Sequence, residues 1–455
     1  MEKISLKTIA AVIGAEYSGE DVMIESICTD TRSIEKGCLF IAFAGERFDA
    51  HSFAEAAAQN GAAALVCQKP VRCNAPVLYV DDTRKAYLDI AGYYRSLFSI
   101  PLVGITGSVG KTTTKEFVAL ALSAKYKTLK TEGNINNDIG MPRTLLRLDK
   151  SYEAAVIEMG MNHFGEIHNL VLRAKPTLGV ITNIGVSHIE NLGSREGILK
   201  AKLEILDGME PDAPLLINAD NDLLAGVRLP ERKVYTFGIE SNADFKAVEI
   251  ESKNGGTSFE IVYAAGRTPI FIPAVGEHNV LNAACAFAVG ILCGIDEKEI
   301  AKKLSEYVPS GMRQRVVDCG NFTVIEDCYN ASPDSMRASL NMLSEFGKGK
   351  KIAVLADMLE LGEFSEKMHR DIGAYAAEKN IDLLLCLGEA SSFTAQQANL
   401  QGIKACKHFS SREALLEALI TELENGSTVL FKGSHGMHLE ITIKSLYERM
   451  GLKNE

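Results

Sequence analysis

The chain has 455 residues, of which 46% are hydrophobic and 24% charged, and its formal net charge is -11. This composition is ordinary for a globular protein, and the length exceeds what one hydrophobic core supports, so we expect about three domains. The negative charge excludes a global basic field for nucleic acid or anionic lipid. No apolar run approaches the roughly 20 residues that span a bilayer. A polyanionic substrate must therefore be held by local clusters of cations and backbone N–H groups.

The 10 cysteines are scattered without a C-x-x-C pair, which predicts free thiols in a reducing compartment. A short apolar run over 9–15 is flanked by Glu2 and Glu16, so we expect an amphipathic first helix and no signal peptide. Together these features predict a cytoplasmic protein.

Residues 1–98 predict a small α/β domain. Buried strands are expected over 39–43 and 63–67, with a helix over 53–60 between them. A helix over 84–98 closes this domain.

Residues 99–311 predict a central domain with a mostly parallel, doubly wound sheet, because strands and helices alternate there. Its strands are expected over 102–105, 154–158, 178–182, 215–218 and 234–237. From 243 to 273 a period-two pattern with a Gly255-Gly256 turn predicts an antiparallel flap on this domain.

Residues 312–455 predict a C-terminal Rossmann-like domain, which begins after the breaker segment Pro309-Ser310-Gly311. Its strands are expected over 322–326, 352–355, 383–387 and 429–432. The predicted fold class is therefore α/β, with three domains in a row.

The segment Thr106-Gly107-Ser108-Val109-Gly110-Lys111-Thr112 lies between a predicted strand and a predicted helix, as a phosphate-binding loop requires. Lys111 would contact the β- and γ-phosphates of a nucleotide, and the Thr112 hydroxyl would bind Mg²⁺. Ile105 stands where the strict motif has its first glycine. The loop predicts a nucleoside triphosphate site, but by itself it leaves a small-molecule kinase open.

Two further residues follow neighbouring strands of the same sheet. Glu158 ends the strand over 154–158, where a carboxylate beside a phosphate loop can bind Mg²⁺. His188 follows the next strand, and its place on an adjacent strand-end loop favours a functional role over an ordinary surface or core histidine. Lys200 and Lys202 lie on a predicted helix over 195–209, and their sequence context alone indicates ordinary solvated charges.

These segments together resemble the Mur ligase family, whose members are ATP-dependent enzymes that extend the peptide of the cell-wall precursor. The resemblance covers nearly the whole chain and is carried by TGSVGKTTTKE at 106–116, TEGNINNDIG at 131–140, EMG at 158–160, NIGVSH at 183–188, AKLE at 201–204, INADND at 217–222 and GEHNVLNAA at 276–284. It implies ATP and two Mg²⁺ ions as cofactors, with the first domain binding a UDP-linked substrate.

The resemblance also implies roles for individual residues. Lys111, Glu158, His188 and Lys202 are the implied catalytic residues, with Thr112, Glu158, His188 and Lys202 as metal ligands. Lys202 matches a lysine that is carbamylated by CO₂ in this family, so that it can act as a carboxylate. The implied ATP-binding residues are Gly107, Ser108, Val109, Gly110, Lys111, Thr112, Thr113, Asn279, Asn282, Arg313 and Asp327. The implied substrate-binding residues are Asp30, Arg32, Asp49, His51, Asn134, Asn137, Tyr329, Asn330 and Ser332.

The C-terminal segment 325–336, IEDCYNASPDSM, resembles the loop of the family member that adds D-alanyl-D-alanine to UDP-N-acetylmuramoyl-tripeptide. It implies these two substrates and an acyl phosphate intermediate. For the deprotonation of the incoming amine, Asp327 and His369 are the candidate bases. Ser332, Ala356 and His435 depart from the family pattern. The alternatives are the ligase that adds the third amino acid, a phosphoryl transferase, and a non-catalytic uridine-nucleotide-binding protein. We expect no nucleic-acid partner, no membrane insertion and a monomer.

Overall fold

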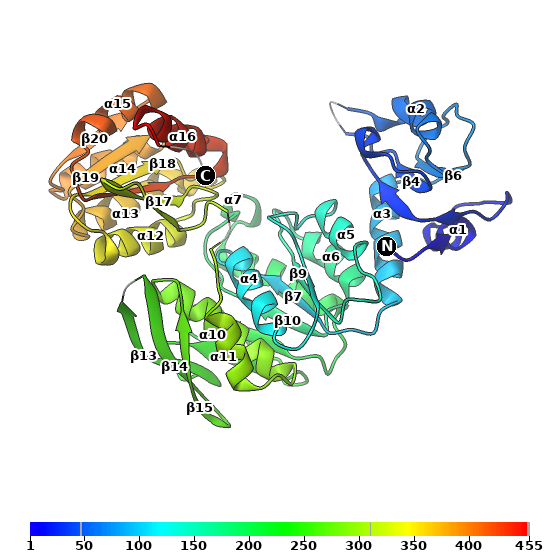
Figure 1. The fold of residues 1–455 in the computed structure, drawn as a ribbon, viewed down its shortest axis with the longest axis horizontal. Coiled ribbons are helices and arrows are strands. Elements are labelled where there is room, and N and C mark those ends of the chain that lie inside the picture. Colours follow the sequence, from blue (N-terminus) through cyan, green and yellow to red (C-terminus); the bar gives the residue numbers. More distant parts are fainter. Residues whose placement is uncertain (46–47, 254, 310, 453–455) are drawn as a thin grey trace.

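The computed structural model describes residues 1–45, 48–253, 255–309 and 311–452, so Ser310 of the predicted boundary lies outside the described residues. The chain forms a large central domain with a smaller lobe at either side of it (Figure 1). All three parts combine helices with parallel strands, which confirms the predicted α/β class. In the described part of the chain, no helix is long and apolar enough to cross a membrane.

The N-terminal lobe contains a 4-stranded parallel sheet in the order β3-β4-β5-β6. Its elements are β1 (Ile4–Ser5), α1 (Leu6–Ile13), β2 (Met23–Ile24), β3 (Ser26–Cys28), β4 (Cys38–Ile41), α2 (Ala54–Gln59), β5 (Ala64–Cys67), β6 (Val77–Tyr79) and α3 (Thr83–Ser96). The Ser5 side chain caps α1 by accepting from Thr8 N at 3.1 Å, and the helix ends at Gly14 with a left-handed φ of 68°.

The central domain contains a 9-stranded sheet in the order β15-β14-β13-β12-β11-β10-β7-β9-β8. Its strands are β7 (Leu102–Thr106), β8 (Thr128–Lys130), β9 (Ala154–Glu158), β10 (Leu178–Ile181), β11 (Leu215–Asn218), β12 (Val234–Gly238), β13 (Phe245–Lys253), β14 (Gly256–Tyr263) and β15 (Gly266–Ile272). Strands β13 to β15 pair antiparallel, which confirms the predicted flap.

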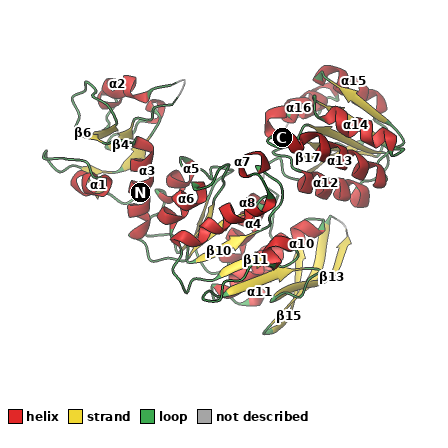
Figure 2. Ribbon diagram, turned by 180° about the vertical axis from the view of Figure 1, so that it is seen from behind, coloured by secondary structure: helices red, strands yellow, loops and turns green. Residues whose placement is uncertain are grey.

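Helices cover both faces of the central sheet (Figure 2). They are α4 (Lys111–Leu122), α5 (Gly140–Leu145), α6 (Glu166–Ala174), α7 (Ile189–Leu192), α8 (Arg195–Leu203), α9 (Asp222–Ala225), α10 (Glu277–Leu292) and α11 (Glu297–Leu304). Helix α10 is apolar on nearly every side, and it packs against α4 and against strands β11 to β13.

The C-terminal lobe contains a 6-stranded sheet in the order β16-β17-β21-β18-β19-β20. Its elements are β16 (Arg315–Asp318), β17 (Phe322–Asp327), α12 (Pro333–Phe346), β18 (Lys351–Ala356), η4 (Gly362–Phe364), α13 (Ser365–Glu378), β19 (Leu383–Leu387), α14 (Ser391–Leu400), β20 (Cys406–Phe409), α15 (Arg412–Glu422), β21 (Ser427–Lys432) and α16 (Leu439–Arg449). Only β16 pairs antiparallel among the described strands of this sheet.

Helix α3 attaches the N-terminal lobe to the central domain. Its buried residues Tyr87, Ile90 and Tyr94 belong to one hydrophobic core with residues of α6, such as Ile167 and Leu170. The Tyr94 hydroxyl donates to Leu148 O at 2.5 Å and accepts from Glu2 N at 2.6 Å. The predicted boundary at residue 98 therefore separates two sheets that share a core, and it stays a prediction as a domain boundary.

Candidate active site

The phosphate-binding loop connects β7 to α4. Gly107 and Gly110 have φ values of 153° and 80°, a region that side chains disfavour, and Gly110 directly precedes the first residue of α4. The Lys111 ammonium donates to Gly107 O at 2.8 Å and to Ser108 O at 3.3 Å. Burial lowers the pKa of Lys111, and the Glu158 carboxylate partly offsets that effect. The Lys111 ammonium thus lies against the carbonyl groups of the phosphate-binding loop, where it could contact a bound phosphate.

Asn183, at the end of the neighbouring strand β10, shapes this loop. Its Oδ1 accepts from Ser108 N at 3.1 Å and from Val109 N at 2.9 Å, while Ser108 Oγ accepts from Gly185 N at 2.9 Å. Because these bonds fix the loop backbone and Asn183 lines the cavity over it, Asn183 is a site residue that the sequence analysis did not single out. Its position in the NIGVSH segment was the available signal.

Glu158 lies fully buried at the end of β9. Its Oε1 accepts from Thr112 Oγ1 at 3.1 Å and from Asn136 Nδ2 at 2.8 Å. Its Oε2 is buried and has no hydrogen-bond partner among the described residues. A buried carboxylate oxygen without a hydrogen bond is costly in a protein interior, so this atom fits the position of a metal-ligand oxygen.

His188 and Lys202 lie on the two segments after β10. His188 has a left-handed φ of 64°, and its Nδ1 lies 2.7 Å from Oε2 of Glu360 in the C-terminal lobe. This contact lowers the pKa of Glu360. Lys202 is 1% exposed, so it is not the solvated charge that its helix context suggested. Burial and the nearby Lys111 ammonium hold the pKa of Lys202 well below its usual range.

Within the described ranges, no three His, Cys, Asp or Glu side chains gather closely enough to bind a metal ion. A metal at Glu158 would therefore need further ligands of another kind. The Thr112 hydroxyl, a modified Lys202 or substrate phosphate oxygens could supply them.

A cavity of about 2220 Å³ lies over the phosphate loop and is lined by all three parts of the chain. It brings together most of the predicted site residues. These are Ser108, Val109, Gly110, Lys111, Thr112, Thr113, Asn134, Asn137, Glu158, His188, Asn279, Asn282, Arg313, Asp327, Tyr329, Asn330 and Ser332. Gly107 and Lys202 lie behind this surface, and Asp30, Arg32, Asp49 and His51 lie away from it in the N-terminal lobe.

Asn279 and Asn282 stand at the start of α10, beside the loop. Asn279 Nδ2 donates to Val275 O at 2.8 Å, and Asn282 Oδ1 accepts from Thr114 Oγ1 at 2.8 Å. Both amides are therefore fixed by the protein and keep one polar atom each for a ligand.

The C-terminal lobe presents Arg313 and Tyr329 to the cavity, with the guanidinium 4.1 Å from the ring centre. Ser332 is the N-cap of α12, where its Oγ accepts from Ser335 N at 3.4 Å. Asn330 Oδ1 accepts from Ala331 N at 2.9 Å. A cap is a role that serine and asparagine share, so the Ser332 departure leaves the helix start intact.

The two predicted bases are both engaged. Asp327 Oδ2 accepts from Lys432 Nζ at 2.8 Å and from Ser339 Oγ at 2.6 Å. His369 is buried, its Nε2 accepts from Met358 N at 3.0 Å, and its Nδ1 lies 2.8 Å from Ser365 O. Both ring nitrogens of His369 are occupied and the residue does not line the cavity, so the structure gives it a structural role and not that of a base.

In the N-terminal lobe, Asp30 and Asp49 each cap a short 3-10 helix. Arg32 pairs with Asp30 at 2.6 Å, and the Asp49 carboxylate binds His51 Nδ1 at 2.6 Å and the Lys69 ammonium. The Arg32 guanidinium lowers the pKa of Asp30 to about 2. These turns hold their side chains close together, and their role toward a ligand stays a prediction.

Comparison with known proteins matches three family models in chain order. They are the Mur ligase family catalytic domain over residues 23–98, the Mur ligase middle domain over 105–290 and the Mur ligase glutamate ligase domain over 312–435. The UDP-N-acetylmuramoyl-tripeptide--D-alanyl-D-alanine ligases of Bacillus subtilis and Escherichia coli are 39% and 36% identical, each over 98% of this chain and 99% of theirs.

Solved structures agree with these matches. A crystal structure of MurF from Acinetobacter baumannii has a TM-score of 0.92 and 32% identity, covering 98% of this chain and 99% of that one. The MurF ligase of Thermotoga maritima in complex with ADP has a TM-score of 0.85 and 27% identity, covering 94% and 98%. Together with the phosphate loop and Glu158, these matches define the class, an ATP-dependent amide-forming ligase. The chain belongs to the Mur ligase family.

Proposed function

We propose that this protein joins D-alanyl-D-alanine to UDP-N-acetylmuramoyl-tripeptide with hydrolysis of ATP, giving the pentapeptide precursor of peptidoglycan. One observation carries the proposal: Tyr329 and Asn330, from the loop that resembles the D-alanyl-D-alanine-adding ligases, line the same cavity as Lys111 and Glu158. The two relatives described above are named for this reaction.

The reaction needs an activated carboxylate, because joining a carboxylate to an amine in water is unfavourable. The terminal carboxylate of the tripeptide would attack the γ-phosphorus of ATP, which gives an acyl phosphate and ADP. The dipeptide amine would then attack the acyl carbon, and the tetrahedral intermediate would expel phosphate. Lys111 and the N–H groups at the start of α4 would bind the phosphates, and the C-terminal lobe would exclude water from the acyl phosphate.

The residues around Glu158 fit Mg²⁺, because its buried Oε2 has no hydrogen-bond partner within the described chain. We propose two ions, held by Thr112, Glu158, His188 and a carbamylated Lys202. Bound Mg²⁺ would supply positive charge against the transferring phosphoryl group.

The carbamate on Lys202 would form when its neutral amine attacks the carbon of CO₂ and releases a proton to water. Burial and the nearby Lys111 ammonium lower the pKa of Lys202, which favours the neutral amine that this step requires. Lys202→Ala should lose activity and regain part of it in short carboxylic acids, and labelled CO₂ should give a carbamate ¹³C signal in the parent enzyme. Lys200→Ala, an exposed lysine of the same helix, is the matched control. An active Lys202→Ala enzyme without added acid would exclude the carbamate.

We also propose that residues 1–98 bind the UDP moiety through Asp30, Arg32, Asp49 and His51, that 99–311 bind ATP, and that 312–455 bind the dipeptide. Asn134 and Asn137 would contact the tripeptide from the cavity wall. The enzyme would act as a monomer in the cytoplasm, which sedimentation and cell fractionation can test.

The deciding assay measures phosphate release from ATP and UDP-N-acetylmuramoyl-tripeptide with D-alanyl-D-alanine, with single amino acids, or with no amine. The proposal requires one phosphate for each amide formed, and only with the dipeptide. Stoichiometric release with a single amino acid would identify a ligase for an earlier residue. A stable phosphate ester without any amine would identify a phosphoryl transferase.

A further inference from the structure

Lys115 is a fully buried lysine that the nucleotide chemistry above does not use. It lies one helical turn after Lys111 on α4 and is 0% exposed. Lysine is rarely buried completely unless its ammonium is paired. Its retention there needs a physical reason.

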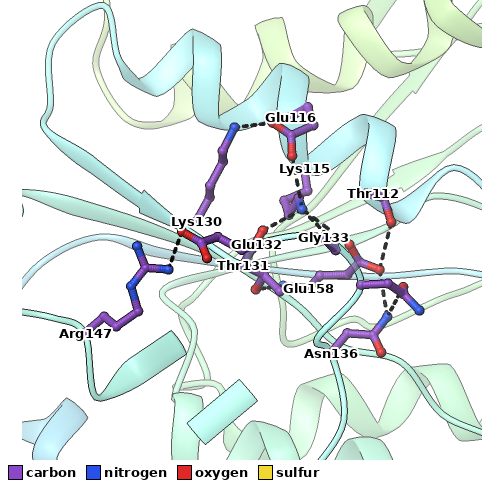
Figure 3. A network of polar contacts seen from close by, with 11 residues as sticks. Thr112, Lys115, Glu116, Lys130, Thr131, Glu132, Gly133, Asn136, Arg147 and Glu158 are labelled. Carbon is purple, nitrogen blue, oxygen red and sulfur yellow. Dashed lines mark hydrogen bonds and ion pairs between the residues drawn. The ribbon is translucent and has the colours of Figure 1, made fainter. Parts of the chain in front are cut away.

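The Lys115 ammonium lies between helix α4, the segment after β8 and Glu158 at the end of β9 (Figure 3). It donates to Thr131 O at 2.5 Å and to Gly133 O at 3.1 Å, both in the segment that follows β8. It also lies 3.1 Å from Glu116 Oε1 and 3.9 Å from Glu158 Oε2. Its three N–H groups thus have acceptors in the two carbonyls and Glu116, and Glu158 receives its charge without a hydrogen bond.

The segment that Lys115 anchors returns directly to Glu158. Glu158 N donates to Thr131 Oγ1 at 3.0 Å, and Gly160 N donates to Asn136 O at 2.9 Å. The Asn136 amide then donates to Glu158 Oε1 at 2.8 Å. A Cβ on Gly160 would lie 2.7 Å from Asn136 Oδ1, so a side chain at residue 160 would displace the Asn136 amide.

We propose that Lys115 is a positioning residue: it anchors residues 131–136 to α4 so that Asn136 occupies one Glu158 oxygen and leaves the other free for Mg²⁺. The inference rests on the proposed metal role of Glu158. Lys115, Asn136 and Glu158 would then be coupled: loss of the lysine would displace Asn136, and the Glu158 carboxylate would no longer be held in place.

Loss of the Lys115 charge and loss of its anchoring contacts predict opposite effects on Mg²⁺ binding, which makes the proposal testable. Removal of a positive charge 3.9 Å from Glu158 would by Coulomb's law strengthen the attraction for a divalent cation. Loss of the anchor would weaken it, because Asn136 would no longer fix the carboxylate. We expect position to dominate in Lys115→Met, with about a tenfold rise in the Mg²⁺ concentration needed for half-maximal ADP binding, the equivalent of one hydrogen-bonded contact.

The experiment is calorimetric titration of ADP at a series of MgCl₂ concentrations, with ADP affinity in EDTA as the check that the phosphate loop is intact. Lys130→Met is the matched control, because Lys130 binds the same Glu116 from the outer side and is 43% exposed. It should leave the Mg²⁺ dependence unchanged. No amine substrate is present, so the result stands apart from the assay of the proposed reaction.

A double-mutant cycle tests whether Lys115 acts through Asn136. Asn136→Leu should raise the Mg²⁺ requirement similarly. The double variant Lys115→Met/Asn136→Leu should need no more Mg²⁺ than the single variant with the higher requirement. Lys115→Arg, which keeps the charge but has a planar fork, should also raise it, and it replaces Lys115→Met if that variant does not fold. An unchanged or lower Mg²⁺ requirement, additive effects in the cycle, or normal behaviour of Lys115→Arg would each overturn the proposal.

Discussion

Removal of one partner from the buried ion pair of the C-terminal lobe should lower the free energy of unfolding by an amount that can be estimated. Asp327 and Lys432 face each other at the ends of the adjacent parallel strands β17 and β21. Their side chains are 8% and 4% exposed, and Lys432 Nζ lies 2.8 Å from Asp327 Oδ2. Ser339 Oγ donates to the same oxygen at 2.6 Å. Asp327→Ala would leave the Lys432 ammonium buried without a counter-charge.

Removal of one partner from a buried ion pair costs about 3–5 kcal/mol, because the remaining charge is not solvated. A whole domain is stable by only about 5–15 kcal/mol, so the C-terminal lobe should lose a large part of its stability. Replacement of both charges by apolar groups of similar size is often neutral. Asp327→Leu/Lys432→Met should therefore recover most of the loss.

The assay is urea unfolding followed by far-ultraviolet circular dichroism, since the chain has 0 tryptophans. Glu417→Ala is the control: its ion pair with Arg449 is exposed on both sides, and such pairs contribute about 0–1 kcal/mol. The reasoning fails if Asp327→Ala costs no more than this control, or if the double variant is less stable than Asp327→Ala.

Three other outcomes are expected. Gly107→Ala should weaken ADP binding at least about tenfold by calorimetry, because the added Cβ would collide with Thr182 Oγ1; wild-type affinity would contradict the required loop geometry. Ser332→Ala should lower the unfolding free energy of the C-terminal lobe by about 0.5–2 kcal/mol through loss of the α12 cap, whereas Ser332→Asn should keep it; equal losses would exclude the cap. Burial lowers the pKa of His369, so the unfolded chain takes up a proton first as pH falls below the unfolded pKa of about 6.5. Stability should then decline between pH 7 and 5, and His369→Gln should flatten this dependence in thermal melts; an unchanged slope would assign the acid sensitivity to other groups.

Strands and helices with strong periodicity or a long apolar run could be predicted from the sequence. The strands β9 and β11 coincide with their predicted ranges because buried parallel strands are continuous apolar runs. The edge strands β16 and β20 were missed, since their side chains are largely exposed and give no apolar pattern. Short edge strands depend on the neighbouring strand and not on their own composition.

Some residues of the candidate site could likewise be predicted from the sequence, and others could not. Lys111, Thr112 and Glu158 could be placed because Glu158 ends a strand and the other two follow a strand in a recognisable spacing. Lys115 and Asn136 could not, because their roles depend on carbonyl groups and amides that meet only in the folded chain. His369 was considered as a base for the incoming amine, whereas its ring nitrogens contact the backbone at Met358 and Ser365.

The core that α3 shares with the central domain has a consequence for how the chain folds. Hydrophobic residues from Ile4 to Leu224 pack in one cluster, while the C-terminal lobe has two clusters largely of its own. One side of the N-terminal sheet should therefore complete its core only after α6 has left the ribosome, although the other side has a cluster of its own. Both parts should melt in one cooperative transition because they share the first cluster. The C-terminal lobe should melt separately, and a protease that cuts between the two units should release it intact.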